Sequence, residues 1–427
     1  ASQTAFESGW RDMPPGERAG LLHNLAKRIR KNVEAIAQLE TRNVGKPIGD
    51  ARWEADAAAK VFEYYAGAIG HLCGQTIPVA RGGFDFTLRQ PMGVIAAITP
   101  WNFPFLIACW KVAPALAAGN SVVLKPASLT PLTALMLGQL GQEAGLPDGV
   151  LQVLPGSGAE AGHALATHPL VRKIGFTGST EVGTTIMKLA ADDIKRVSLE
   201  LGGKSPNIVF ADADWQRAAA ESPMSVFANT GQDCCARSRM FIEQSIFDDF
   251  VDQFVTATEA LNIGDPTNEA TQVGPMVCAA QRELSESFVT NARDAGREIR
   301  SGGDRPCERG FYLNPVVITG VETGDRAWRE EIFGPVVCLR PFTDETEMLR
   351  EVNDTNFGLS GSVWSSNMSR ALRVARQVES GVISVNTHSS VHTEAPFGGF
   401  KRSGLGRDLG MSAMEACTEV KNIYVGE

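Results

Sequence analysis

The strongest constraint on the fold is an alternation of short strands and amphipathic helices between residues 93 and 203. The predicted strands are short and largely apolar, and they lie at 94–98, 121–124, 151–154, 173–176 and 197–199. The predicted helices between them lie at 104–117, 131–144, 159–167 and 180–191. Such alternation indicates an α/β protein with a parallel sheet covered on both faces. Ligands of these sheets bind at the carboxyl ends of the strands.

The rest of the chain extends this plan. Two helices are predicted over 16–40 and 50–70, followed by a hairpin around Gly82 and Gly83. A second alternating block runs from about 204 to 400; its predicted helices and strands include 216–229, 245–260, 280–296, 316–318, 368–379 and 382–385. Because 427 residues exceed what one core usually covers, two domains are expected, with a boundary near 203.

Composition excludes several partners. A net charge of −9 argues against nucleic acid and anionic membranes, and no run of 18 apolar residues predicts a membrane span. The eight cysteines contain no CxxC pair, so we expect no metal site and no disulfide framework. Scattered free cysteines are typical of a reducing compartment, and we expect a cytoplasmic location.

Cys234 and Cys235 differ from the other cysteines because they lie in a loop with Gly, Gln and Asp. Glu200, in Leu199-Glu200-Leu201-Gly202-Gly203-Lys204, ends a predicted strand. A thiolate adds to a carbonyl carbon, and a carboxylate then activates the water that hydrolyses the acyl-enzyme. A hydride must leave between these steps, so the pair predicts NAD(P)-dependent oxidation of an aldehyde to an acid. The glycines after Glu200 suit close approach of a nicotinamide ring.

Two other classes remain open at this point. A cysteine hydrolase or acyltransferase also needs a thiol, but it normally needs a histidine base, and none of the six histidines lies in a recognisable partner motif. A catalytically silent protein usually loses the thiol or the base, and both are kept here.

Further polar groups follow the strand ends. Asn102, in Pro100-Trp101-Asn102-Phe103-Pro104, is a candidate oxyanion donor; the alternative is a rigid turn with a solvated Asn. Lys125 could reach ribose hydroxyls or a phosphate, or simply be solvated. The turns at Gly156-Ser157-Gly158 and Gly178-Ser179 leave backbone N–H groups free for a pyrophosphate. Neither turn matches GxGxxG, and ordinary turn chemistry also explains them. Glu331 could bridge ribose hydroxyls, and Phe333 could pack on the nicotinamide.

Seven ordered motifs make the chain resemble the aldehyde dehydrogenase superfamily over essentially its whole length. They are PWNFP at 100, KPAS at 125, FTGST at 176, LELGGK at 199, GQDCCA at 231, EEIFGPV at 330 and PFGGFKRSGLGRDLG at 396. The resemblance implies that Cys234, not Cys235, is the nucleophile, Glu200 the general base and Asn102 the oxyanion donor. It implies cofactor contacts at Trp101, Lys125, Gly178, Ser179, Glu331 and Phe333. Ser128 and Gly158, in neighbouring turns, are further candidate cofactor residues.

The resemblance also implies a domain plan. Residues 1–72 and 92–203 would bind the cofactor, 204–410 would form the catalytic domain, and 73–91 with 411–427 would form a small β oligomerisation element. The hairpin and the alternating apolar tail at 418–425 resemble the family's oligomerisation elements, so we expect a homodimer or homotetramer in which the tail pairs with another subunit.

The chain departs from the family at two places. Many NAD-preferring members carry Glu at the position of Ser128, where it grips the ribose and repels a 2′-phosphate; Ser therefore leaves the cofactor as NAD or NADP. The family normally has several dozen more residues before the first helix, so an N-terminal segment is expected to be missing.

The substrate is expected to be an aldehyde with a cationic end. Asp233 precedes the nucleophile, and Glu394 lies near the turn that lines the family's substrate tunnel. The aromatic tunnel positions match Phe103, Trp110 and Phe397. Carboxylates and rings favour a cation by roughly 0.5–2 kcal/mol and disfavour an anionic semialdehyde. GQDC and Asn386-Thr387-His388 also resemble the aminoaldehyde branch, which includes 4-aminobutanal and betaine aldehyde dehydrogenases. The alternative is a generalist for aliphatic aldehydes or semialdehydes, in which both acids face solvent or pair with Arg237 or Arg402.

Overall fold

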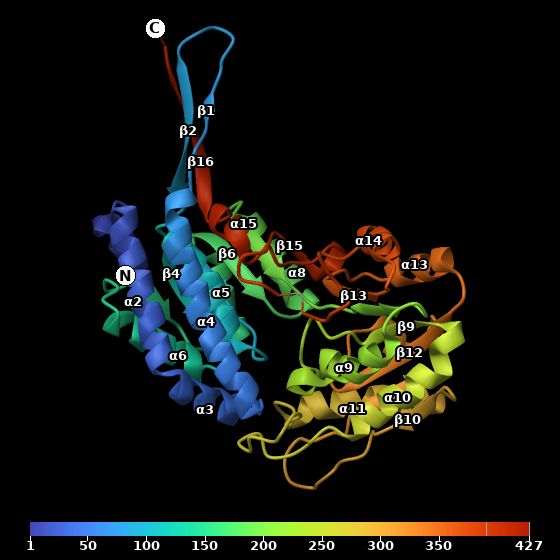
Figure 1. The fold of residues 1–427 in the computed structure, drawn as a ribbon. Coiled ribbons are helices and arrows are strands. Elements are labelled where there is room, and N and C mark those ends of the chain that lie inside the picture. Colours follow the sequence, from blue (N-terminus) through green and yellow to red (C-terminus); the bar gives the residue numbers. More distant parts are fainter. Residues whose placement is uncertain (390, 427) are drawn as a thin grey trace.

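The computed structural model describes residues 1–389 and 391–426, and their strands form three separate sheets. A six-stranded sheet lies mainly in the first half of the chain and a seven-stranded sheet in the second half. A three-stranded sheet projects from the body as a narrow arm (Figure 1). Among the described residues, no helix combines the length and apolarity that a membrane span needs.

The six-stranded sheet confirms the predicted parallel α/β plan. Its order is β15-β7-β6-β3-β4-β5, and only β15 is antiparallel to its neighbour. The strands are β3 (Val94–Ile98), β4 (Ser121–Lys125), β5 (Leu151–Val153), β6 (Val171–Thr177), β7 (Arg196–Glu200) and β15 (Gly404–Leu405). All five residues of β3 are buried, as expected of an inner strand covered on both faces. The carboxyl ends of β3, β4, β5, β6 and β7 meet at one edge.

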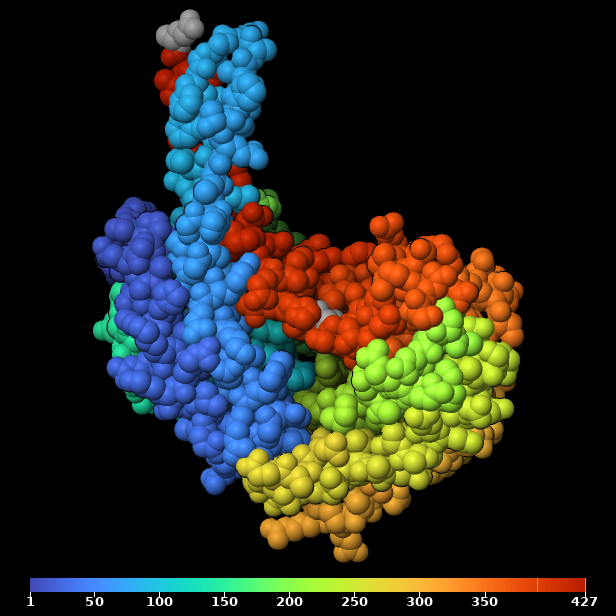
Figure 2. Space-filling view, in the orientation of Figure 1, coloured from blue at the N-terminus to red at the C-terminus, as the bar shows by residue number. Residues whose placement is uncertain are grey.

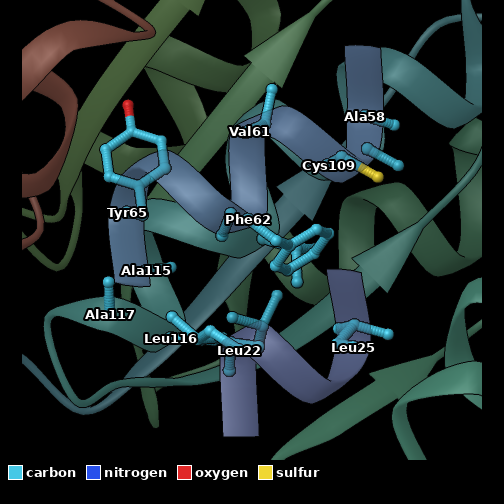
Figure 3. Close-up of a cluster of buried hydrophobic side chains, with 14 of the residues drawn as sticks. Leu22, Leu25, Ala58, Val61, Phe62, Tyr65, Cys109, Ala115, Leu116 and Ala117 are labelled. Carbon is cyan, nitrogen blue, oxygen red and sulfur yellow. The ribbon is translucent and has the colours of Figure 1, made fainter. Parts of the chain in front are cut away.

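The N-terminal helices pack on this sheet around one apolar core, part of which is drawn in Figure 3. Its helices are α1 (Ser2–Ala5), α2 (Pro15–Lys31), α3 (Val33–Val44), α4 (Ile48–Ala68), α5 (Pro104–Ala117) and α6 (Leu132–Glu143). Leu22, Leu25, Phe62 and Leu116 are completely buried in this core. A second apolar cluster packs α7 (His163–Thr167) and α8 (Thr180–Ala191) against β3, β6 and β7. The single helix predicted over 16–40 is wrong, because the backbone leaves the helical region at Asn32 and two helices form.

The seven-stranded sheet has the order β10-β11-β12-β9-β8-β13-β14, and only β10 is antiparallel. Its strands are β8 (Pro206–Val209), β9 (Arg239–Glu243), β10 (Glu298–Ser301), β11 (Val316–Thr319), β12 (Val336–Phe342), β13 (Ser360–Trp364) and β14 (Val382–Val385). Its helices are α9 (Trp215–Phe227), α10 (Phe247–Glu259), α11 (Ala279–Asp294), α12 (Arg326–Arg329), α13 (Glu345–Asn353) and α14 (Met368–Gln377). The short α15 (Gly410–Glu415) leads into the arm.

The arm contains β1 (Thr76–Ile77), β2 (Phe84–Pro91) and β16 (Thr418–Val425). β1 and β2 form the predicted hairpin. β16 pairs antiparallel with β2 of the same chain over its whole length, from Thr418 opposite Pro91 to Val425 opposite Phe84. The prediction considered only a partner subunit; the structure uses one edge of β16 within the chain and leaves it as the outer strand of the arm. Residue 427, the last of the predicted element, lies outside the described residues.

Candidate active site

A cavity of about 250 Å³ lies between the two large sheets and contains both Cys234 and Glu200 in its walls. It opens where the molecule is hollowed between the N-terminal helices and the segments of the second half of the chain (Figure 2). Its walls come from α4, α5, the end of β7, the loop before β9 and the 391–408 segment. The structure therefore brings the predicted nucleophile and the predicted base to one enclosed space.

The loop that carries Cys234 is held by the residues just before it. Asn229 and Thr230 have positive φ values of 49° and 60°, and Gly231 follows at 71°. A Cβ on Gly231 would lie 2.2 Å from the carbonyl oxygen of Gly334, so this position requires glycine. The side chain of Gln232 donates to the Asn229 carbonyl at 2.9 Å and accepts from the backbone N–H of Val277 at 2.9 Å. The Gly-Gln pair of the motif thus fixes the turn that presents the thiol.

The two adjacent thiols have different surroundings. Cys234 is half-buried and Cys235 is buried, although both line the cavity. The carboxylate of Asp233 and the two sulfur atoms lie within 4.8 Å of one another. A hydrogen bond with Cys235, burial and the nearby Asp233 and Glu331 carboxylates raise the pKa of Cys234 well above its usual value. The thiol is therefore the stable form, and attack needs help from groups that favour the thiolate.

Glu200 ends β7 and is 3 % exposed. Within the described part of the chain, neither carboxylate oxygen has a hydrogen-bond partner. Burial, followed by the charge of Asp408, raises the pKa of Glu200 well above its usual value. A Cβ on Gly398 would lie 2.5 Å from its Oε1, so the Pro396-Phe397-Gly398-Gly399 turn closes over the carboxyl group. An unpaired buried carboxyl beside a thiol has the properties expected of a general base.

The glycines after Glu200 make room for protein groups. A Cβ on Gly202 would lie 2.1 Å from the carboxylate of Glu331, and one on Gly203 would lie 2.3 Å from the carbonyl oxygen of Cys234. The expectation that they also suit a nearby nicotinamide ring stays a prediction. They place the LELGGK strand end directly against the nucleophile loop.

Asn102 lies against the same loop. Its Nδ2 donates to the carbonyl of Gln232 at 3.0 Å, and Asn229 donates to the carbonyl of Asn102 at 3.0 Å. A carboxamide has two N–H donors, so one stays available for an oxyanion. The side chain is 3 % exposed, which excludes the alternative of a solvated Asn.

The predicted cofactor residues gather at the carboxyl edge of the six-stranded sheet. Lys125 ends β4 and donates to the carbonyl of Pro126 at 2.9 Å, and burial lowers its pKa. Ser128 is exposed and donates to the carbonyl of Gly156 at 2.9 Å. Gly158 begins a wide helical turn (Gly158–Gly162) that continues as α7, so the predicted helix at 159–167 starts irregularly. Ser179 caps α8 by accepting from Val182. A Cβ on Gly178 would lie 2.6 Å from the Phe176 ring.

Trp101, Glu331 and Phe333 form the inner end of this edge. The rings of Trp101 and Phe333 meet edge to face with centroids 5.2 Å apart. Glu331 accepts the backbone N–H of Gly203 at 2.9 Å, and burial raises its pKa to about 7. This arrangement fits a dinucleotide. The N-terminus of α8 suits a phosphate, Lys125 and Ser128 suit a ribose, and the aromatic pair suits a ring, all along one edge of the sheet.

Four of the five predicted substrate residues line the cavity, namely Phe103, Trp110, Asp233 and Phe397. Trp110 and Phe397 meet edge to face at 5.4 Å. Asp233 is half-buried, and its carboxylate accepts the backbone N–H of Cys235 at 2.8 Å. Its own loop therefore holds this carboxylate at the cavity. Glu394 is exposed and borders an adjoining hollow with Trp53 and Trp110, so the structure does not bring it into the cavity of Cys234.

The wall of the cavity that comes from α4 and the residues just before it was not predicted. Lys46, Asp50, Trp53 and Glu54 all line the cavity. Lys46 pairs with Glu54 in the buried interior, and its ammonium lies 4.1 Å from the centre of the Phe103 ring. Burial raises the pKa of both Asp50 and Glu54. The available signal was an acid at Asp50 and Glu54, four residues apart, on a helix whose neighbouring positions are buried alanines.

Comparison with known proteins identifies the family of the chain. The sequence model of the aldehyde dehydrogenase family matches residues 1–423. Aminoaldehyde dehydrogenase 2, peroxisomal, of Pisum sativum is 43% identical over 426 residues, which are 98% of this chain and 85% of the pea protein. Phenylacetaldehyde dehydrogenase of Pseudomonas fluorescens is 42% identical over 435 residues, covering 100% of this chain and 86% of that protein. The crystal structure of an NAD-dependent aldehyde dehydrogenase from Sinorhizobium meliloti has a TM-score of 0.98 at 41% identity, covering 99% of this chain and 85% of that chain.

Fold and relatives together define an oxidoreductase. The chain belongs to the aldehyde dehydrogenase family, which confirms the resemblance seen in its motifs. Its reaction class is the oxidation of an aldehyde to a carboxylic acid. The relatives act on chemically different aldehydes, so the substrate has to be inferred from the cavity of this chain.

Proposed function

We propose that this chain oxidises an aldehyde with a positive charge at its far end, such as 4-aminobutanal or betaine aldehyde. The observation that carries the proposal is the composition of the cavity wall: beside Glu200 and Asp408 it contains Asp50, Glu54 and Asp233, and among the described lining residues Lys46 alone carries an ammonium. Burial raises the pKa of Asp50 and Glu54, and Lys46 only partly offsets this effect. A cationic substrate end supplies the missing positive charge, and the aromatic rings add cation–π attraction.

The residues have separate roles in the proposed reaction. The Cys234 thiolate attacks the carbonyl carbon, and the oxyanion accepts from Asn102 Nδ2 and the Cys234 backbone N–H. A nicotinamide cofactor held at the carboxyl edge of the six-stranded sheet would supply the hydride acceptor, and loss of hydride from this carbon would leave a thioester on Cys234. Glu200 takes a proton from water, the water attacks the thioester, and the C–S bond breaks to release the acid. The kept carboxylate at Glu200 favours water over coenzyme A as the acceptor.

The cofactor is NAD or NADP. It would be held by Lys125 and Ser128 at the ribose, by the Gly178-Ser179 end of α8 at the pyrophosphate, and by Glu331 and Phe333 towards the nicotinamide. Ser128 donates to Gly156 and carries no charge to repel a 2′-phosphate. We expect Ser128→Glu to suppress NADP use selectively, measured as kcat/KM with each cofactor. A wild-type protein that does not use NADP at all would refute this assignment.

A specific observation favours a second candidate, a generalist for neutral aliphatic aldehydes. Asp233 is already engaged by the N–H of Cys235, and Lys46 already occupies the face of Phe103. Asp233 and Lys46 would then stabilise the fold and would not bind the substrate. Under this alternative, butanal and 4-aminobutanal should have equal kcat/KM.

The deciding experiment compares kcat/KM for 4-aminobutanal, betaine aldehyde, butanal and succinic semialdehyde. We expect the two cations to be preferred over butanal, and Asp50→Asn and Glu54→Gln to reduce that preference about tenfold, the effect of roughly 1.4 kcal/mol. Asp56 on the same helix is half-buried, pairs with Arg30 and Lys60 and does not line the cavity, so Asp56→Asn is the matched control. If succinic semialdehyde is the best substrate, the acidic wall does not select the substrate. If butanal equals 4-aminobutanal in all variants, the generalist is correct.

The proposal also includes the location and the assembly of the protein. A thiol nucleophile next to a second thiol works only where cysteines stay reduced, which supports a cytoplasmic location. The projecting arm supports assembly into a homodimer or homotetramer, as argued below.

A further inference from the structure

The motif Asn386-Thr387-His388 has no part in the reaction described so far, yet the structure ties it to the nucleophile loop. Asn386 has a positive φ of 55°, and its carboxamide accepts from the N–H and donates to the carbonyl of Ser365. His388 is packed at 5.1 Å from the Trp364 ring. The motif is thus a rigid turn after β14, and Val391, which follows it, lines the substrate cavity.

Arg237 joins this turn to the loop that carries Cys234. The side chain is 3 % exposed. Its Nη1 donates to the carbonyl of Cys235 at 2.8 Å, its Nη2 to the carbonyl of His388 at 3.2 Å, and its Nε to the hydroxyl of Ser362 at 3.2 Å. Three donors of one planar group therefore hold three segments in a fixed relation.

The hydrogen bonds around His388 suit a neutral ring. Because Arg237 donates to Ser362 Oγ, the Ser362 hydroxyl can donate to His388 Nδ1 at 3.2 Å. Asn207 donates to Ser222 Oγ in the same way, so of the two serines beside His388 one donates to the ring and the other accepts from it. Burial, followed by the charges of Arg237 and Arg217, lowers the pKa of His388 to about 3. His388 is neutral, so it does not share the positive charge of Arg237.

The charge of Arg237 matters because the thiol is surrounded by acids. The groups that act on Cys234 are Asp233 and Cys235 in its own loop and Glu331 before β12. Glu200 of β7 faces it across the cavity. Each of these, when ionised, opposes a thiolate, whereas Arg237 interacts favourably with negative charge on Cys234 and Cys235.

We propose that Arg237 is a positioning residue that favours the Cys234 thiolate, through a fixed positive charge anchored to Cys235, Ser362 and the His388 turn. The proposal rests on the proposed role of Cys234 as nucleophile. It concerns the ionisation of the thiol, which is measurable without turnover.

The test follows alkylation of Cys234 by iodoacetamide against pH, with mass spectrometry as readout. All variants carry Cys235→Ala so that a single thiol of the loop reacts. We expect Arg237→Gln to shift the midpoint upward by about one pH unit and to slow alkylation at pH 7.5 about tenfold. Arg237→Lys, which keeps the charge, should restore most of the profile.

The matched control is Arg217→Gln. Arg217 donates to the carbonyl of Asn386 in the same turn at 3.3 Å, but it is exposed and stacks on the outer side of Trp364. Its loss should leave the midpoint unchanged. The proposal is overturned if folded Arg237→Gln keeps the wild-type midpoint, or if Arg237→Lys shifts as far as Arg237→Gln. If Arg237→Gln does not fold, Arg237→Met serves as the neutral variant, and a wild-type midpoint in Arg237→Met overturns the proposal. Loss of aldehyde oxidation with an intact alkylation profile would instead count against the proposed function.

Discussion

At the scale of single residues, the two adjacent cysteines give the clearest prediction. Cys234 is half-buried at the cavity, whereas Cys235 is 5 % exposed and packs into the apolar core. We expect Cys234→Ala to abolish aldehyde oxidation and Cys235→Ala to keep most of it, as measured by formation of reduced cofactor. If Cys235→Ala is the inactive variant, the assignment of the nucleophile within the motif is wrong.

Glu200 predicts a separation of two kinetic phases. Its pKa is raised by burial, so the carboxylate form needed to activate water increases as pH rises. Steady-state turnover of the wild type should therefore increase with pH through this pKa. Glu200→Gln cannot accept a proton, so it should give a burst of reduced cofactor and then a slow rate without that increase. Loss of both phases together would show that Glu200 acts before the thioester forms.

The residues found from the sequence and those missed differ for a physical reason. Cys234, Glu200 and Asn102 carry local signals: Glu200 and Asn102 lie at or just after the end of a predicted strand, and Cys234 lies in a Gly-containing loop after a predicted helix. Asp50 and Glu54 lie within a regular helix, and only long-range packing brings them to Cys234. Glu394 was expected at the cavity because it is near Phe397 in sequence. It borders an adjoining hollow instead, since sequence distance does not determine the direction of a side chain.

At the scale of secondary structure, the buried pair between α5 and the 391–408 segment predicts a change in stability. Lys111 and Asp408 lie 2.8 Å apart with side chains only 3% and 7% exposed. Lys111→Met leaves an uncompensated buried carboxylate, and we expect a loss of about 3–5 kcal/mol in the free energy of unfolding, measured in urea. Because Lys111 lowers the pKa of Glu200 and Asp408 raises it, the pH limb of turnover should also move upward.

Two controls distinguish this effect from general damage. Lys111→Met combined with Asp408→Asn removes both charges and should recover most of the lost stability. Lys60→Met breaks the exposed pair with Asp56 and should cost less than about 1 kcal/mol. An equal loss for Lys60→Met and Lys111→Met would contradict the role of burial.

Elements with strong periodicity were predicted well, and the errors fall where a local backbone change has no sequence marker. The strand at Val94–Ile98 and the helix at Pro104–Ala117 have the predicted bounds. The apolar stripe of the first helix continues through Val33 and Ile36, so nothing marked a break at Asn32. The Asn32 side chain donates to the Arg28 carbonyl at 2.8 Å, which caps the end of α2.

At the scale of the whole molecule, the proposed catalytic groups come from both large sheets. Glu200 ends the last parallel strand of the six-stranded sheet, and Cys234 precedes β9 of the seven-stranded sheet. The proposed boundary near 203 falls between these sheets. β15 returns from the second half of the chain to pair with β7, with Gly404 opposite Glu200. We therefore propose that residues 396–410 of the catalytic region hold the two domains together.

The arm predicts how the chain assembles. β16 is its outer strand, and Val420, Tyr424 and Val425 are 58%, 51% and 52% exposed, as is Phe84 of β2 at 53%. An outer strand with exposed apolar side chains favours pairing with another subunit. We expect a dimer or tetramer by light scattering at micromolar concentration, and a shift towards smaller species in Val420→Asp with Tyr424→Asp.

The control is Leu284→Asp, which should leave the mass unchanged. Leu284 lies in α11, is 41% exposed and is distant from the arm in sequence. A wild-type monomer, or equal effects of the arm and control variants, would show that the arm does not mediate association.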